Sequence, residues 1–162
     1  MGVLPAVDVG KSVSRVGGNA QRAAYRGVAG DLKLAYAQFS ELESFAKFGT
    51  RLDEQTRKVI EHGQRIRAIL KQPELEPASV PEQLVILLAL TGGLLDAVPI
   101  LKMREAEQAL RKSVANIPAE VRQRFSSKDR LSDDDRKAIL QAARTAIAPF
   151  LPPPPSQPEK KS

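Results

Sequence analysis

The sequence predicts an all-α fold, a bundle of helices preceded by a short strand and loop, and two patterns lead to this prediction. Between Asn19 and Ala148 the apolar residues recur at the three- and four-residue spacing of amphipathic helices, separated by residues that start or end helices. From Val3 to Gly10, by contrast, a short apolar stretch is punctuated by Pro and Gly, which is typical of a strand that leads into a loop.

The first two helices are expected to pack as a hairpin. Asp31 is the predicted N-cap of the first helix and Gly49 the residue just after its end, with Leu32, Ala35, Tyr36, Phe39, Leu42 and Ala46 on its apolar face. The stretch Thr50–Asp53 has the form of a capping box and predicts the start of the second helix, which ends before Pro73.

Prolines mark the start of the later helices. Pro81 suits the first turn of a third helix, which contains the apolar run Leu84–Leu90, and the prolines between residues 73 and 81 predict an extended linker before it. Gly92 and Gly93 weaken the end of that helix. Pro99 and Pro118 suit the starts of two further helices.

The last helix and the tail complete the predicted organisation. Ser132 and the three aspartates after it predict a helix N-terminus, with Ile139, Leu140 and Ile147 facing inward. Residues 149–162 contain six of the 12 prolines and are expected to be polyproline-like or disordered. The sequence therefore divides into an extended segment over 1–18, a helical domain over 19–148 and a proline-rich tail over 149–162.

Composition excludes several classes of chemistry. The 162 residues include no Cys and one His, which rules out disulfides, thiolate nucleophiles and Cys-based zinc sites, and we expect no metal site. The longest apolar run, Leu84–Leu90, is far shorter than the roughly 20 residues of a membrane-spanning helix. The formal net charge is +6, but its Lys and Arg residues are dispersed among acidic ones, so we expect no nucleic-acid partner.

Three local features invite a functional reading that their context does not support. Gly10-Lys11-Ser12 resembles the end of a phosphate-binding loop, but Pro5 stands where that loop needs its first Gly. His62 lies among charged residues in a predicted helix and is expected at the surface or boundary, and Phe39, Phe45 and Phe48 are expected to pack in the core. No nucleophile, base and orienting group come together, so the chain alone is expected to be catalytically inert.

The segment Ser12 to Gln21, which reads SVSRVGGNAQ, resembles the signature of the alpha subunits of F-type ATP synthases. Further stretches resemble the same family in the same order: VAG at 28–30, LAYAQF at 34–39, FAKFG at 45–49, LD at 52–53 and ILKQ at 69–72. Lys11 and the stretch 48–54 look closer to the variant group of these synthases that is linked to sodium transport.

The resemblance implies roles for two residues of the extended segment. In the family, the Arg of SVSR reaches across the interface between alpha and beta subunits to the nucleotide of the catalytic beta subunit, so Arg15 is expected to be an arginine finger. Ser12, together with Ser14, would shape the loop that presents it. Residues 1–18 would then be a remnant of the family's α/β nucleotide-binding domain, and the helices would form its C-terminal helical bundle.

The family also binds nucleotide at non-catalytic interfaces, and the chain retains half of that motif. Pro5 and Gln72 match the family pattern, whereas Leu4 stands where Arg is usual and Glu74 where a second Gln is usual. ATP or ADP with Mg²⁺ is expected at the interfaces of the assembled complex, and no cofactor is expected on this chain alone.

The implied complex is an ion-transporting ATP synthase, peripheral on the cytoplasmic face of a bacterial membrane. The implied partners are the beta subunit, the gamma and delta subunits and, indirectly, the membrane Fo sector. Because the family's β-barrel and phosphate-loop domain would precede Met1, the chain is expected to be a C-terminal fragment of the alpha subunit. The alternative is a truncated, stand-alone helical interaction module without catalysis.

Overall fold

The computed structural model describes residues 23–46, 52–71, 77–127 and 130–152, and this part of the chain is helical without strands. Its helices are α2 (Ala23–Ala46), α3 (Glu54–Leu70), α4 (Val80–Thr91), α5 (Met103–Ser113), α6 (Ala119–Arg124) and α7 (Asp133–Ile147), with 3₁₀-helices η1 (Ile100–Lys102), η2 (Val114–Asn116) and η3 (Ala148–Phe150). The all-α prediction is confirmed. The predicted strand and loop over 1–18 and most of the predicted tail lie outside the described residues.

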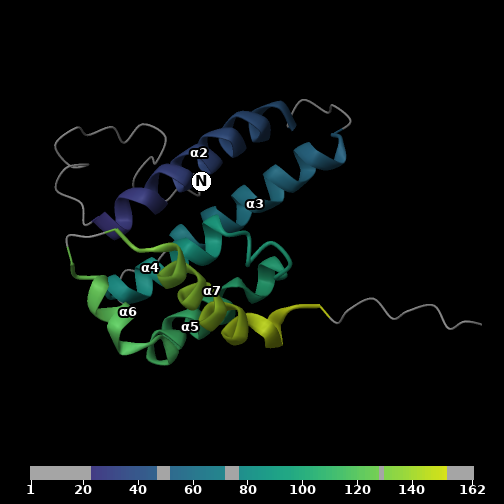
Figure 1. The fold of residues 1–162 in the computed structure, drawn as a ribbon. Coiled ribbons are helices and arrows are strands. Elements are labelled where there is room, and N and C mark those ends of the chain that lie inside the picture. Colours follow the sequence, from purple (N-terminus) through teal and green to yellow (C-terminus); the bar gives the residue numbers. More distant parts are fainter. Residues whose placement is uncertain (1–22, 47–51, 72–76, 128–129, 153–162) are drawn as a thin grey trace, which may run out of the picture.

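Helices α2 and α3 lie side by side and pack against each other as the predicted hairpin (Figure 1). The predicted N-cap of the first helix is wrong, because Asp31 lies inside α2, which already includes Ala23. Ala24 and Val28 extend the buried face of Leu32 toward the N-terminus at four-residue spacing, and burial of that face sustains the helix through Gly27 and Gly30.

Helix α3 begins at Glu54, later than a capping box at Thr50–Asp53 predicts. Asp53 is the N-cap, and its carboxylate accepts a hydrogen bond of 2.7 Å from the backbone N–H of Thr56. This hydrogen bond from the backbone of Thr56 is the main reason why the pKa of Asp53 lies below its usual value. Ile60, Ile66 and Ile69 are buried on the side of α3 that joins the core.

Helix α4 packs against three other helices, α2, α5 and α7. It is apolar on all sides, as expected of a helix enclosed by others, and its buried residues are Leu84, Val85, Ile86, Leu88, Ala89 and Leu90. Pro81 lies in its first turn as predicted. Gly92 is its C-cap, and Gly93 follows with a φ of 68°, a left-handed conformation that favours Gly.

Three of the later helices, η1, α6 and α7, start where the sequence predicts. Pro99 precedes η1 and Pro118 precedes α6. Ser132 caps α7 in a capping box with Asp135, and Ile139 and Ile147 are buried. Burial raises the pKa of Asp135, but hydrogen bonds with Ser132 and the charge of Arg124 outweigh this effect, so the pKa lies below its usual value.

Among the described helices, none combines the length and the apolar character that crossing a membrane requires.

Candidate functional site

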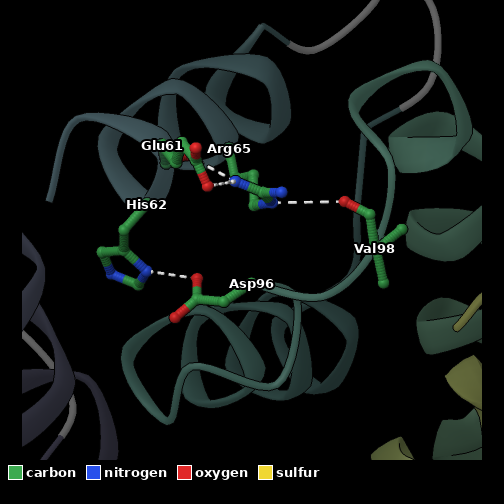
Figure 2. Close-up of polar contacts among 5 residues, drawn as sticks. All are labelled: Glu61, His62, Arg65, Asp96 and Val98. Atoms are coloured by element: carbon green, nitrogen blue, oxygen red, sulfur yellow. Dashed lines mark hydrogen bonds and ion pairs between the residues drawn. The ribbon is translucent and has the colours of Figure 1, made fainter. Parts of the chain in front are cut away.

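The turn between α4 and α5 is held against α3 by polar contacts from one face of that helix (Figure 2). His62 and Arg65 lie about one helical turn apart and therefore point to the same side of α3. His62 reaches Asp96, with 2.5 Å between Nδ1 and Oδ1, and since a carboxylate only accepts hydrogen bonds, Nδ1 is the donor. We call His62, Arg65, Asp96 and Val98 the latch.

Arg65 makes the second contact of the latch. Its Nε donates a 3.2 Å hydrogen bond to the backbone carbonyl of Val98, and its Nη1 donates a 2.9 Å hydrogen bond to the carbonyl of Glu61 in its own helix (Figure 2). The Glu61 carboxylate lies 4.0 Å from the same Nη1. Two side chains of α3 thus hold the turn at Asp96 and Val98, while the buried side chains of Leu95 and Val98 fix it to the core.

The latched turn leads directly into η1, which exposes apolar side chains. Leu101 is 91% exposed and Ile100 is 48% exposed. Beside them, a groove of about 310 Å³ runs between the end of α3 and α5, with Ala68 and Met103 among its apolar lining residues. Its charged lining includes Lys71 and Arg104, so the apolar residues of η1 stand next to cations.

One further ion pair closes the far side of the groove. Arg111 donates to Oε1 of Glu107 from Nη2 at 2.6 Å and from Nε at 3.2 Å, and the Glu107 side chain is almost fully buried. The positive charge of Arg111 also contributes, after hydrogen bonding with Ser79, to a lowered pKa of Glu82 at the start of α4. The carboxylate of Glu107 is therefore already partnered and does not offset the charge of Lys71 or Arg104.

A sequence model of one protein family covers most of the described structure, including the latch and the groove. The family is described as "ATP synthase alpha/beta chain, C terminal domain", and its model matches residues 21–146. The chain belongs to this family.

Relatives with high sequence identity are alpha subunits. The chain is 68% identical over 154 residues to ATP synthase subunit alpha 2 of Albidiferax ferrireducens, an alignment that covers 95% of the chain and 29% of that subunit. It is 61% identical over 151 residues to ATP synthase subunit alpha 1 of Shewanella frigidimarina, covering 93% of the chain and 29% of the relative. The chain therefore spans about three tenths of the length of these relatives.

The site residues that the sequence predicts for this member of the ATP synthase alpha/beta family lie outside the described residues. Pro5, Ser12 and Arg15 lie within 1–22, and Gln72 lies within 72–76. Their roles stay predictions. Within the described residues, no group of three or more His, Asp or Glu side chains is placed to hold a metal ion.

The aromatic residues of α2 were expected in the core, and this prediction is partly wrong. Phe39 is fully buried, Phe45 is 60% exposed, and Phe48 lies outside the described residues. Six residues separate Phe39 from Phe45, which turns the second side chain by about 240° around the helix axis. The spacing alone thus places Phe45 on a different face of α2.

The buried Phe39 is part of a cation–aromatic contact between the two helices of this domain. Arg67 of α3 places its guanidinium carbon 4.5 Å from the centroid of the Phe39 ring. It also donates hydrogen bonds of 2.8 and 2.6 Å to the two carboxylate oxygens of Glu43 in α2, and this pairing raises the pKa of Arg67. The contact fixes α3 against α2 and has a structural role.

His62 is half-buried at the boundary of the helical domain, as the sequence predicts, but its partner could not be foreseen. Asp96 is 34 residues away along the chain. No local pattern signals this pairing, because His62 lies in α3 and Asp96 in the turn after α4, and the two residues meet only in the folded domain.

Proposed function

We propose that the chain is the C-terminal region of the alpha subunit of an F-type ATP synthase, and that it supplies an arginine finger to the catalytic site of a neighbouring beta subunit. The observation that carries this proposal is the 68% identity to an alpha subunit over 95% of the chain. The SVSR sequence at 12–15, which includes Ser12 and Arg15, lies at the start of that chain and supports the assignment of the finger.

The chemistry of Arg15 suits this role. Its guanidinium is planar, stays charged at physiological pH and offers several N–H donors to the phosphoryl oxygens on which negative charge develops during transfer. Such a group can be supplied in trans by a neighbouring subunit. In this proposal Ser12 shapes the loop that presents Arg15. The helical domain is part of the alpha subunit in a ring of alternating alpha and beta subunits.

The proposed partners are the beta, gamma and delta subunits and, through them, the membrane sector. ATP or ADP with Mg²⁺ would bind at the interfaces of the ring on the cytoplasmic face of the membrane. Pro5 and Gln72 would contribute to the non-catalytic nucleotide site, where Leu4 and Glu74 replace two usual contacts and weaken adenine binding.

The experiment compares assembled complexes whose alpha subunit carries this sequence with Arg15 intact or replaced. Arg15→Ala is expected to lower ATP turnover on the order of 10³-fold, while assembly and nucleotide binding persist. Arg15→Lys should recover little, because an ammonium cannot reproduce the planar set of donors. Arg57→Ala, which removes an exposed Arg of α3, is the matched control and should leave turnover unchanged. Wild-type turnover in the Arg15→Ala complex would refute the assignment.

A second measurement addresses the subunit itself. An antibody raised against residues 100–148 should detect, in a cell lysate, a polypeptide several times longer than 162 residues that fractionates with membranes. A polypeptide of 162 residues free of beta subunit would instead support the stand-alone helical module.

A further inference from the structure

The surface formed by Ile100, Leu101 and the adjoining groove has the features of a protein docking site. Leu101 is the most exposed large apolar residue of the described chain at 91%, and Ile100 stands next to it at 48%. The two other strongly exposed apolar residues, Leu34 and Phe45, lie apart on α2. Scattered apolar residues are normal on a surface, but an adjacent pair beside a groove is a candidate contact.

The groove continues on both sides of Ile100. The larger hollow, of about 310 Å³, lies against α5, and a smaller one of about 200 Å³ lies against α3 near Gln64 and Arg67. Ile100, Ala68 and Lys71 line both hollows. A partner that covered Leu101 could therefore place a side chain in the depression on either side of Ile100.

The charged residues around this surface are cationic and favour a partner that carries carboxylates. Lys71, Lys102 and Arg104 are all exposed, and no salt bridge to them is present within the described part of the chain. The groove's own carboxylate, Glu107, is held by Arg111. The surface thus presents an apolar centre with a cationic rim, which is complementary to aliphatic side chains flanked by carboxylates.

The latch ties the turn that leads into this surface to α3. His62 and Arg65 hold Asp96 and the carbonyl of Val98, a short distance along the chain from Ile100 (Figure 2). The turn is therefore ordered before a partner arrives, and binding does not bear the entropy cost of ordering it.

We propose that Ile100, Leu101 and the groove beside them bind an amphipathic helix of another protein, one whose contacting stripe combines aliphatic residues with Glu or Asp. The proposal goes beyond the proposed function, since it needs neither Arg15 nor a nucleotide. Lys71 and Arg104 would pair with the carboxylates, while Leu101 packs against the aliphatic stripe.

The test uses the full 162-residue chain and a synthetic helical peptide of about 18 residues, or five turns, that repeats Leu at three- and four-residue spacing with Glu on both flanks. A second peptide replaces each Glu by Lys. Fluorescence anisotropy without nucleotide should show the acidic peptide binding at least about tenfold more tightly than the basic one, with an affinity that falls as salt is raised.

Variants of the chain locate the site. Leu101→Ser should weaken binding about tenfold, and Arg104→Glu should weaken it by a similar factor. Since both side chains are exposed, these variants should retain the helical circular-dichroism spectrum. Leu34→Ser and Arg57→Glu change exposed residues of α2 and α3 that lie outside this surface and should leave the affinity unchanged.

Three results would overturn the proposal. One is equal binding of the two peptides, and another is unchanged binding by the Leu101→Ser chain. The third is self-association of the chain that Leu101→Ser abolishes while no peptide binds, which would assign the surface to a second copy.

Discussion

Phe39 of α2 occupies the space that the missing side chain of Gly63 leaves on α3. A Cβ atom at position 63 would lie 2.0 Å from Cγ of Phe39 and 2.3 Å from its Cβ. These atoms are at the root of the Phe39 side chain, so a rotamer change cannot relieve the clash and the helices must separate. We expect Gly63→Ala to lower the free energy of unfolding by about 2 kcal/mol, despite the better helix propensity of Ala, in urea titrations followed by circular dichroism.

Gly30 provides the matched control for this prediction. It lies inside α2, and a Cβ atom there would meet nothing within 4 Å. Gly30→Ala should therefore raise the free energy of unfolding by about 0.5–1 kcal/mol through helix propensity alone. If both substitutions shifted stability in the same direction, the close approach of Phe39 to Gly63 would not be what limits position 63.

Replacement of Arg67 by Lys should destabilise the fold. Arg67→Lys keeps the positive charge but loses the paired hydrogen bonds to Glu43 and the stacking on Phe39. We expect the free energy of unfolding to fall by about 1–2 kcal/mol, because the side chains of Arg67 and Glu43 are both largely removed from solvent.

The exposed pair Lys58–Glu54 is the comparison for Arg67. Its side chains are 72% and 81% exposed, so Lys58→Ala should change stability by less than about 0.5 kcal/mol. A double-mutant cycle with Arg67→Lys and Glu43→Gln should give non-additive losses. Additive losses would mean that the two residues act independently.

The helix starts near Pro81, Pro99, Pro118 and Ser132 could be predicted because the signals are local. A proline with its fixed φ, or a side chain that bonds a backbone N–H three residues away, acts whatever the rest of the chain does. Asp31 carries such a signal as well, yet α2 runs through it. Burial of a continuous apolar face outweighs one capping side chain, and the extent of that burial depends on α3 and α4.

The candidate site, unlike the helix starts, could not be predicted from local sequence signals. His62 and Asp96 are brought together by packing, and no local pattern predicts a contact across 34 residues. The exposure of Leu101 is also a property of the assembled bundle, since Leu95 in the same region is buried. Arg15 and Ser12 were reached through motif resemblance alone, and they remain predictions for the experiments proposed above.

Stability should fall in acid in part through Glu82. Hydrogen bonding with the side chain, and then the backbone, of Ser79 lowers the pKa of Glu82 below the usual value of 4.5 for a Glu side chain. A carboxyl whose pKa is lower in the folded state stabilises the fold above the unfolded pKa, and this contribution disappears as pH falls through the folded pKa. The sensitive range therefore begins near pH 4.5 and extends to lower pH.

Glu82→Gln isolates this contribution, because Gln can still accept the hydrogen bond from the Ser79 backbone. We expect the variant to be about 0.5 kcal/mol less stable than the parent at pH 7, and we expect this difference to be smaller near pH 3, in urea titrations at both values. Glu120→Gln, an exposed substitution in the first turn of α6, controls for a general loss of negative charge. An equal difference at both pH values would show that packing, and not charge, is responsible.

The latch should govern local rather than global stability. In the His62→Ala chain, Asp96 loses its partner while Leu95 and Val98 remain buried, so the turn should open more often without the bundle unfolding. We expect backbone amides of residues 94–98 to exchange hydrogen several-fold faster, and trypsin to cleave faster after Lys102. The free energy of global unfolding should fall by less than about 1.5 kcal/mol. Gln55→Ala, an exposed change on the same helix, should alter neither rate. Unchanged exchange in His62→Ala would mean that the contact between His62 and Asp96 does not help to fix the turn, which the Arg65 hydrogen bond and the buried apolar side chains would then hold.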